Sequence, residues 1–359
     1  MTRDYSQFLP PSPSGTPPRQ LTLLEKLGWQ NLFAQQISAD EMIETPPVRV
    51  VEVHRNGLHV RGEGIDETLP PNAQATVGDW LLYDAEFPAQ SRLLERKSLL
   101  KRRAPGSDRQ VQLIAANLDT AFIVTSCNHD FNVARLERYI ALAFEAEVAP
   151  VIVLTKPDLC EAETRAEFES TAVAISERVP VVTVNALGGG VAEALAAWCR
   201  PGQSVGFLGS SGVGKSTLVN ALSGGGGVAT QAVREDDSKG RHTTTRRQLH
   251  LLPDGCAVLD TPGMRELQMT DVRAGVADVF ADLQDLSQRC RFRDCHHESE
   301  PGCAVQRAIE AGEIDAPRVA RWQKLVREEA FNAASLVERK AKGRALSKLI
   351  RGVKKSKPK

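Results

Sequence analysis

The stretch that most constrains the fold is Gly209–Ser216, which reads G-S-S-G-V-G-K-S. Residues 204–208 before it form a short, mostly apolar run, typical of a buried parallel strand, and residues 217–222 after it carry apolar side chains at helical spacing. A strand, a glycine-rich turn and a helix in this order match the G-x-x-x-x-G-K-S phosphate-binding loop, or P-loop. Glycines let backbone N–H groups converge on phosphate oxygens, and the start of the helix adds partial positive charge.

The P-loop motif predicts a role for its side chains. We expect Lys215 to reach the β- and γ-phosphates of a nucleotide and the Ser216 hydroxyl to bind Mg²⁺. The nucleotide-binding residues predicted here are Gly209, Ser210, Ser211, Gly212, Val213, Gly214, Lys215, Ser216 and Thr217. The alternative is a glycine-rich turn that matches by chance, which the flanking strand and helix disfavour.

Composition limits the class of protein. The chain has 359 residues, enough for two or three domains, and its 42% apolar and 25% charged residues are ordinary for a globular protein. No apolar run approaches the roughly 18 residues of a membrane span, and the N-terminus lacks a secretion signal. The formal net charge is zero, so binding to nucleic acid would require local basic patches. We expect a cytoplasmic protein whose seven cysteines stay reduced.

The N-terminal third changes character twice. Residues 1–45 are predicted to form a proline-rich, disordered leader followed by a helix over 21–43. Residues 46–105 contain several short strands and an Asn56-Gly57 hairpin turn, which predict a small β-barrel, with the RNA-binding OB-fold as one candidate. A basic run ends this region and is either a solvated face or a phosphate-binding patch: Arg92, Arg96, Lys97, Lys101, Arg102 and Arg103.

Residues 112–268 are predicted to form an α/β domain. Apolar strand-like runs alternate with helical segments, for example the strand 150–154 between helices over 133–148 and 161–177. Such alternation implies a parallel sheet with helices on both faces. Ligands of these sheets bind just past the carboxyl ends of the strands, so functional motifs are expected there.

One such motif, Thr155-Lys156-Pro157-Asp158, directly follows the strand 150–154. It resembles the guanine-specificity element N/T-K-x-D of GTPases. The Asp158 carboxylate offers two acceptors to the N1–H and N2 amino donors of guanine, whereas adenine presents an acceptor at N1 and is rejected. We expect Lys156 to lie along the base plane. Asn185-Ala186 resembles the S-A-L/K element that contacts the base, with Asn in place of Ser.

A long polar segment, 224–245, follows the helix of the P-loop. In a GTPase this is the place of switch I, where a Thr completes the Mg²⁺ shell when the γ-phosphate is present. Thr243 and Thr244 both fit that role, and the sequence does not choose between them. The apolar strand 257–259 then ends in Asp260-Thr261-Pro262-Gly263, a D-x-x-G motif. We expect Asp260 to hold Mg²⁺ through water and the Gly263 N–H to meet the γ-phosphate.

The order of these motifs is unusual. Ordinary GTPases run P-loop, switch I, D-x-x-G, N-K-x-D and S-A-K along the chain. Here T-K-P-D and N-A-L precede the P-loop, which predicts a circularly permuted domain. A permutation keeps the sheet and moves the chain ends to other surface positions. The D-x-x-G segment then leads directly into the C-terminal region, and we infer that nucleotide state is transmitted there.

Cys290, Cys295, His297 and Cys303 form the second strong motif, C-x₄-C-x-H-x₅-C. Three thiolates and one imidazole make a closed, tetrahedral zinc site with no open position for catalysis; unrelated free thiols are the alternative. We expect one structural Zn²⁺ in a helical domain over 269–340, with helices near 304–311 and 317–341 and with His296 facing solvent. The basic tail 341–359 is a solvated tail or an RNA-binding arm, and we favour the arm.

Together these motifs resemble the ribosome small-subunit-dependent GTPase A family (RsgA type). The likeness rests on G-R-H-T-T-T, D-T-P-G, the permuted order and the Cys₃His spacing, and it covers roughly residues 46–330. It implies an N-terminal OB-fold, a permuted GTPase domain that uses GTP with Mg²⁺, and a C-terminal zinc domain. It further implies a factor that binds the small ribosomal subunit and its rRNA late in maturation, with GTP hydrolysis stimulated by that subunit.

The catalytic group is predicted from what the D-x-x-G motif lacks. Many GTPases place a water-orienting Gln directly after this motif. Here that position holds Met264, which cannot orient water. His242 in switch I is the candidate, as the resemblance also suggests, and Lys215, Thr243 and Thr244 complete the predicted catalytic set.

Two other functions are compatible with parts of the sequence. A P-loop ATPase or small-molecule kinase would use the same loop, but T-K-P-D argues against it. An RNA-binding scaffold would keep the nucleotide as a structural element, and its turnover would not respond to RNA or ribosomes. The chain shows no heptad repeats, so we expect a monomer.

Overall fold

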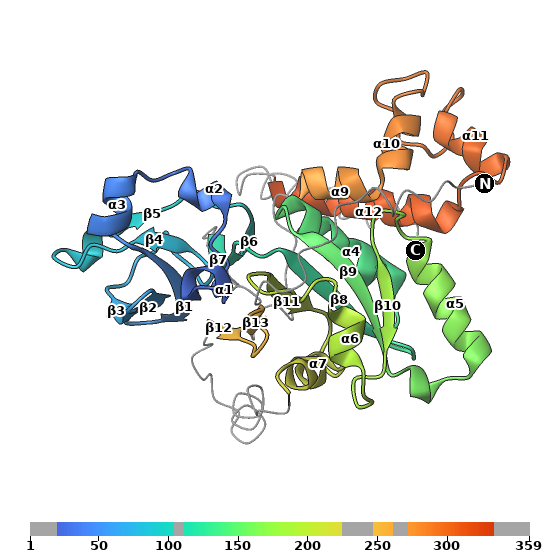
Figure 1. Cartoon of the computed structure of the whole chain (residues 1–359). Coiled ribbons are helices and arrows are strands. Elements are labelled where there is room, and N and C mark those ends of the chain that lie inside the picture. The colour runs from blue at the N-terminus through green and yellow to red at the C-terminus, as the bar shows by residue number, and fades with distance from the viewer. Residues whose placement is uncertain (1–19, 104–110, 225–246, 261–271, 334–359) are drawn as a thin grey trace, which may run out of the picture.

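The computed structural model describes residues 20–103, 111–224, 247–260 and 272–333 (Figure 1). Several sequence predictions fall elsewhere. The proline-rich leader, the basic tail and the site residues His242, Thr243, Thr244 and Gly263 lie outside the described residues.

A mostly parallel sheet with helices on both faces forms the centre of the molecule, which confirms the predicted α/β fold (Figure 1). The parallel strands pair in the order β10-β9-β8-β11-β13. They are β8 (Thr120–Ser126), β9 (Ala149–Thr155), β10 (Val181–Val184), β11 (Ser204–Leu208) and β13 (Ala257–Asp260). The helices that alternate with them are α4 (Val133–Glu145), α5 (Ala162–Val173), α6 (Val191–Leu195) and α7 (Lys215–Leu222).

The two faces of this sheet bury separate apolar cores. Neighbouring residues of β8 enter different cores: Ile123 belongs to the core that contains Ile140 of α4, and Phe122 to the core that contains Leu218 of α7. This period of two is what a strand covered on both faces requires. The sheet is therefore a packed platform for the loops at its carboxyl edge.

The N-terminal β-unit is an antiparallel sheet with strand order β5-β4-β1-β2-β3. It has a small core of its own that includes Val50, Val60 and Leu81. The hairpin predicted at Asn56-Gly57 joins β1 to β2 and is confirmed. The strands are β1 (Pro47–His54), β2 (Gly57–Gly62), β3 (Ile65–Leu69), β4 (Trp80–Leu82) and β5 (Arg92–Leu93).

The prediction of one helix over residues 21–43 is wrong. The chain forms three short helices instead, α1 (Leu23–Lys26), α2 (Asn31–Ala34) and α3 (Ala39–Glu44). Capping boxes start two of them: Thr22 with Glu25 for α1, and Ser38 with Glu41 for α3. These side chains accept hydrogen bonds from the backbone N–H groups at the first turn of each short helix, and so they favour a new helix start at that position. The rough apolar periodicity of residues 21–43 does not reveal these breaks.

The N-terminal β-unit and the central sheet are continuous. β12 (Arg247–Leu251) pairs antiparallel with β13 on one side and with β1 on the other, which gives one sheet of 11 strands. β6 (Leu99–Arg103) and β7 (Val111–Ala116) form a separate two-stranded ribbon. This ribbon crosses the boundary expected between residues 46–105 and 112–268.

The C-terminal part of the described chain is helical. It contains α9 (Arg273–Val279), α10 (Ala281–Ser287), α11 (Ala304–Glu310) and α12 (Ala316–Ala333), so the helices predicted near 304–311 and 317–341 are present as far as residue 333. α9 packs on α4 of the central unit, and α12 lies beside α9 (Figure 1). Among the described helices, none combines the length and apolar character needed to cross a bilayer.

Candidate functional site

The predicted P-loop connects β11 to α7, as its sequence requires. Gly209 leaves β11 so close to β8 that a Cβ there would lie 2.3 Å from the Val124 carbonyl oxygen, so no other residue fits without a backbone shift. The Lys215 ammonium donates to the carbonyl oxygens of Gly209, at 2.8 Å, and Ser210. The ammonium group of this lysine therefore lies over the loop whose N–H groups would cradle phosphates.

The T-K-P-D loop is bonded directly to the P-loop. Thr155 ends β9 with its side chain fully buried, and its hydroxyl donates to the Val213 carbonyl oxygen at 2.6 Å. The Lys156 ammonium donates to the Gly212 carbonyl oxygen at 2.7 Å, from a backbone in the left-handed region with φ of 55°. Two side chains of the T-K-P-D loop thus fix its position relative to the P-loop. The threonine at position 155 supplies the hydroxyl donor for the first of these bonds.

The predicted base-contacting loops leave neighbouring strands at the same edge. Thr155 of β9 is paired with Val184 of β10, so the chain emerges from both strands side by side. Asp158 lies exposed in the 3-10 turn Pro157–Leu159. The Asn185 side-chain oxygen accepts from the N–H groups of Leu187, at 3.0 Å, and of the next residue, which closes a tight turn after β10. Ala186 is held within this turn.

The D-x-x-G strand lies next to the P-loop strand. β13 runs parallel to β11, with Leu259 paired to Gly206, so Asp260 ends its strand at the edge where the P-loop begins. Ser216 and Thr217 stand in the first turn of α7 at the same edge. The described half of the site therefore brings together the predicted phosphate, base and Mg²⁺ motifs, all at the carboxyl ends of parallel strands.

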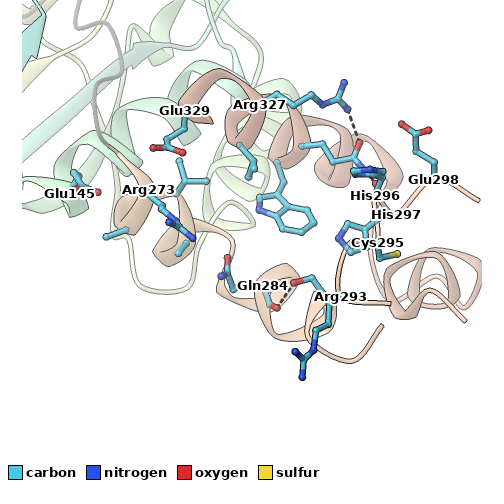
Figure 2. Close-up of a pocket in the computed structure, with 17 residues that line it drawn as sticks. Glu145, Arg273, Gln284, Arg293, Cys295, His296, His297, Glu298, Arg327 and Glu329 are labelled. Carbon is cyan, nitrogen blue, oxygen red and sulfur yellow. Dashed lines mark hydrogen bonds between the residues drawn. The ribbon is translucent and has the colours of Figure 1, made fainter. Parts of the chain in front are cut away.

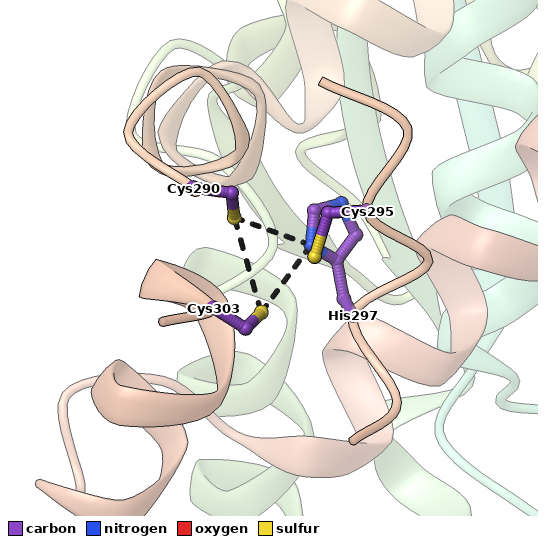
Figure 3. A group of neighbouring side chains, drawn as sticks. All are labelled: Cys290, Cys295, His297 and Cys303. Atoms are coloured by element: carbon purple, nitrogen blue, oxygen red, sulfur yellow. Dashed lines mark hydrogen bonds between the residues drawn. The ribbon is translucent and has the colours of Figure 1, made fainter. Parts of the chain in front are cut away.

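The four predicted zinc ligands, all between residues 290 and 303, converge on one point (Figure 3). The His297 Nδ1 atom lies 3.6 Å from the Cys290 sulfur and 3.5 Å from the Cys303 sulfur, and these sulfurs are 3.8 Å apart. With Cys295 included, all four ligand atoms lie within 4.8 Å of one another. Tetrahedral zinc with Zn–S bonds of about 2.3 Å and Zn–N bonds of about 2.0–2.1 Å has S···S edges of about 3.8 Å and S···N edges of about 3.5 Å. The three distances among Cys290, His297 and Cys303 fit that ion.

Groups around the cluster hold its ligands in place. The backbone N–H of Ala304 points at the Cys290 sulfur at 3.3 Å, and the Cys303 sulfur caps α11 by accepting from the Gln306 N–H at 3.4 Å. The His297 ring stacks on Trp322, with centroids 5.4 Å apart. Burial lowers the pKa of His297, which favours the neutral imidazole that binds metal. Sequence spacing gave no sign of Trp322, because it comes from α12.

A carboxylate that the motif does not contain shapes the metal-binding loop. Glu300 accepts from the backbone N–H groups of His296, Glu298 and Ser299 at 2.7, 2.9 and 3.1 Å. These backbone bonds, led by that from His296, lower the pKa of Glu300 to about 2, so it remains ionised. His296 itself is exposed, as predicted.

A cavity of about 1230 Å³ lies between the Cys₃His group, α9 and α12 (Figure 2). Figure 2 shows Glu145 and Arg273 on one side of it and His296 and Cys295 on the other. Its charged walls carry both signs, so charge alone selects no class of ligand. Two of the four predicted zinc ligands, Cys295 and His297, line it.

The basic run divides into two groups. Arg92 pairs with Glu41 at 2.7 Å, Arg96 with the buried Asp79 at 2.6 Å, and Lys97 with Asp119 at 2.5 Å. These three cations form ion pairs within the fold, a role that neither interpretation of the basic run predicted. Lys101 and Arg102 stand half-buried on the β6–β7 ribbon.

One buried cation was missed by sequence reasoning. The Arg49 side chain is 1% exposed and donates to the carbonyl oxygens of Gly78 and Asn117, both at 3.2 Å, and of Leu27. Burial lowers the pKa of Arg49 to about 10, so the group stays charged near neutral pH. A single arginine in the β-branched run Val48–Val51 was the only available signal.

A P-loop bonded to a T-K-x-D loop that comes earlier in the chain defines a circularly permuted P-loop GTPase. The family model described as RsgA GTPase matches residues 93–270. The chain is 49% identical, over 92% of each chain, to Small ribosomal subunit biogenesis GTPase RsgA 2 of Vibrio parahaemolyticus. It is also 49% identical to the RsgA protein of Mesorhizobium japonicum, over 86% of this chain and 90% of that one. The chain belongs to the RsgA family and is a GTP-hydrolysing enzyme.

Two solved structures share the fold. YjeQ from Thermotoga maritima is 27% identical, with a TM-score of 0.57 over 79% of this chain and 97% of that one. YloQ, described as a circularly permuted GTPase, is 23% identical, with a TM-score of 0.54 over 81% of this chain and 97% of that one. The predicted permutation is thereby confirmed.

Proposed function

We propose that this enzyme binds the small ribosomal subunit and hydrolyses GTP to GDP and phosphate late in the maturation of that subunit. The observation that carries the nucleotide part is the bonding of Thr155 and Lys156 to the P-loop, which sets Asp158 at a fixed place relative to the phosphate site. The ribosomal part rests on the relatives, which are named small ribosomal subunit biogenesis GTPases.

The described side chains fit the binding of GTP. Asp158 would accept from the guanine donors, Lys156 would lie along the base, and Ala186 would contact the base edge from its turn. Lys215 would exchange its carbonyl partners for the β- and γ-phosphates. Mg²⁺ supplies charge neutralisation between these phosphates, and Ser216 and Asp260 would hold it.

The proposed catalytic group is His242. Met264 follows the D-x-x-G motif and has no polar atom with which to orient water, so another residue must do so. His242, with Thr243 or Thr244 beside it on the Mg²⁺ shell and the Gly263 N–H on the γ-phosphate, would form this half of the site. Without a partner that orders it, we expect turnover on the order of 10⁻⁴ s⁻¹, and a partner can add about 10³–10⁵-fold.

The metal is proposed to be one structural Zn²⁺. The support is the closed donor set of Cys290, Cys295, His297 and Cys303, three of which lie at tetrahedral distances from one another. The N-terminal β-unit is proposed to be an OB-fold that contacts rRNA, aided by the basic tail 341–359. We propose that the protein acts as a monomer in the cytoplasm, where ribosomes mature.

The test is steady-state GTP hydrolysis with and without isolated small ribosomal subunits. ATP and large subunits serve as controls, and ATP competition against GTP binding tests the ATPase or kinase alternative. We expect a large increase that requires both GTP and small subunits, and we expect His242→Ala to lower kcat with nucleotide affinity nearly intact. A GTP hydrolysis rate that does not change when small subunits are added would reject the ribosomal role. It would favour an RNA-binding scaffold with a structural nucleotide.

A further inference from the structure

Helix α12 contacts the metal-binding loop through two neighbouring side chains. The Trp322 ring stacks on the ring of His297, one of the proposed zinc ligands, with centroids 5.4 Å apart. The Gln323 side-chain nitrogen donates to the His296 carbonyl oxygen at 2.9 Å. The His297 backbone has a φ of 60°, in the left-handed region that residues other than glycine seldom adopt. Such a conformation persists where surrounding contacts hold it, and α12 supplies two contacts to this loop.

The same helix contacts α4, which packs on the GTPase sheet, through the residue just before Trp322. Nε of Arg321 donates to both carboxylate oxygens of Glu137 on α4, at 3.0 and 2.9 Å, and the Glu137 side chain is fully buried. Seven residues further along α12, and therefore on nearly the same face, Glu328 accepts from Arg138 of α4 at 2.5 Å. Separating a buried carboxylate from its partner is costly, so the Arg321–Glu137 pair holds α12 in one position on α4.

Both sets of contacts come from one turn of a continuous helix. Residues 321–323 are consecutive in α12, so their side chains are spaced about 100° apart around the helix axis. One side of the turn therefore faces α4, and the next faces the metal-binding loop. A shift or rotation of α12 that separates Arg321 from Glu137 also moves Trp322 relative to that loop.

We propose that α12 couples the metal site to the GTPase sheet: zinc binding and the docking of α12 on α4 stabilise each other through Arg321, Trp322 and Gln323. This inference rests on the proposed zinc ion and does not depend on the ribosomal role. Such coupling is reciprocal: if zinc strengthens docking on α4, docking strengthens zinc binding by the same factor. A substitution at the contact with α4 is therefore expected to weaken zinc binding although it changes no ligand.

The contribution of Trp322 is the ring itself. Within the part of the chain that the structure describes, its indole N–H has no hydrogen-bond partner, and the side chain is buried. Phenylalanine keeps an aromatic face toward His297 and loses no hydrogen bond, whereas leucine keeps only apolar bulk. Zinc affinity should therefore distinguish Trp322→Phe from Trp322→Leu.

The experiment measures the zinc affinity of the full chain by competition with a chromophoric chelator at neutral pH. Arg321→Ala acts from α12, Glu137→Gln acts from α4, and Lys324→Ala, which removes an exposed cation from α12, is the matched control. We expect affinity to fall about 5- to 150-fold in Arg321→Ala, the usual range of coupling between sites, and less in Glu137→Gln, which keeps an acceptor. Trp322→Leu should show a similar fall, Trp322→Phe should recover most of it, and Lys324→Ala should match wild type.

Three results would overturn the proposal. The first is wild-type zinc affinity in both Arg321→Ala and Glu137→Gln. The second is an equal loss in Lys324→Ala, which would indicate a general loss of helix stability. The third is equal losses in Trp322→Phe and Trp322→Leu, which would remove the ring stack that the coupling requires.

Two controls separate this proposal from folding defects and from the proposed function. Far-UV circular dichroism and binding of a fluorescent GDP analogue verify that each variant is folded, and Glu137→Gln decides if Arg321→Ala is not. A wild-type protein that holds no zinc would reject the proposed metal site and this inference together. A zinc-loaded wild type with unaffected variants would reject the coupling alone.

Discussion

The GTPase sheet meets its two neighbours through different kinds of contact. On the side of the N-terminal β-unit, backbone groups make the junction: β1 pairs with β12, and Arg49 donates to carbonyl oxygens of separate segments. On the side of the C-terminal helices, side chains and close helix packing make it. α9 approaches α4 so closely that a Cβ on Gly275 would lie 1.9 Å from the Ala141 carbonyl oxygen.

The C-terminal junction also contains a buried ion pair. The Glu137 side chain on α4 is fully buried, and both of its oxygens accept from Arg321 Nε on α12, at 3.0 and 2.9 Å. Nearby, the Glu145 carboxylate accepts from the Gly275 N–H at 2.9 Å. These contacts join helices that can slide or tilt by small amounts, whereas paired strands can shift only by whole register steps.

This difference teaches how a permuted GTPase can communicate with two neighbours. β12 follows the segment 225–246, and α9 follows the segment 261–271. The predicted switch I is thus followed in the chain by β12 of the N-terminal junction, and the D-x-x-G segment is followed by α9 of the C-terminal junction. We infer that each switch is anchored on a different neighbour, so the predicted route to the C-terminal region has a second, strand-based counterpart.

The largest expected effect comes from removing a metal ligand from the C-terminal region. Cys303→Ser deletes a ligand and the cap of α11, and structural zinc sites contribute apparent free energies of about 10–16 kcal/mol. We expect the purified variant to lose its zinc and the region 290–333 to become sensitive to protease. Binding of a fluorescent GDP analogue should persist, because the core beneath the P-loop helix α7 contains no residue of the described C-terminal helices.

Zinc content per chain by elemental analysis measures this effect, with Cys160→Ser as the control outside the cluster. One retained zinc per chain in Cys303→Ser would show that the cluster is not the site. Loss of GDP binding together with zinc would show that the C-terminal junction is not separable from the GTPase sheet.

The backbone-based junction should be broken by Arg49→Met. The substitution keeps an apolar stem but leaves the carbonyl oxygens of Leu27 and Asn117 without the Arg49 donor, at about 1–3 kcal/mol each. We expect a loss of about 3–5 kcal/mol in the free energy of unfolding, measured in urea. Arg55→Met, in the exposed turn after β1, is the matched control and should change little. A loss below about 1 kcal/mol would mean that strand pairing alone holds this junction.

Arg321→Ala should weaken the helix-based junction in a pH-dependent way. It leaves Glu137 buried without its partner, which costs about 3 kcal/mol near pH 7. Burial raises the pKa of Glu137, and Arg321 opposes that shift, so the variant should raise this pKa further. A raised pKa stabilises the fold while the group is protonated, and this stability is lost as pH rises through the folded pKa. The deficit should therefore shrink from pH 7 to pH 5.

Urea unfolding at the two pH values measures this change. The double variant Glu137→Gln, Arg321→Ala has no carboxylate at this position and should show no such pH dependence. An Arg321→Ala deficit that is equal at pH 5 and pH 7 would contradict a buried, ionised Glu137.

The smallest effect is expected from an exposed contact of the same junction. Arg178 pairs with Asp278 of α9 at 2.9 Å, but their side chains are 62% and 45% exposed. Solvent-screened pairs contribute about 0.2–1 kcal/mol, and salt weakens them further. Arg178→Ala should therefore shift urea unfolding slightly at low salt and hardly at all at high salt. A decrease above about 2 kcal/mol in the free energy of unfolding would show that exposed ion pairs, and not buried contacts, stabilise this junction.

The sequence predicts those parts of the candidate site whose residues lie close together along the chain. The P-loop, the T-K-P-D loop and the Cys₃His set were all found, because strand–loop–helix order and ligand spacing fix their geometry within short segments. The alternation of strands and helices in the central sheet could be predicted for the same reason. Neighbouring residues such as Phe122 and Ile123 are both apolar because they enter cores on opposite faces of the strand.

Contacts between segments that are far apart in the chain could not be predicted from the sequence. Nothing near Arg49 in the sequence indicates that Leu27 and Asn117 accept its protons, and nothing near Arg247 indicates Leu113. The pairing of β12 with β1 joins residues that are far apart in the chain, and single-sequence patterns carry no register across such gaps. The junctions, which decide how the switches are anchored, therefore had to come from the fold.

The most direct test of separate anchoring is amide hydrogen exchange of the wild-type enzyme with GDP and with a non-hydrolysable GTP analogue. The paired amides of β1 and β12, including those around Val53 and Arg247, report on the N-terminal junction, and those of α9 report on the C-terminal one. We predict that the GTP analogue raises protection at both junctions, while the remaining strands of the N-terminal β-unit stay unchanged. Protection that changes in α9 alone, with β1 and β12 identical in both states, would contradict the account.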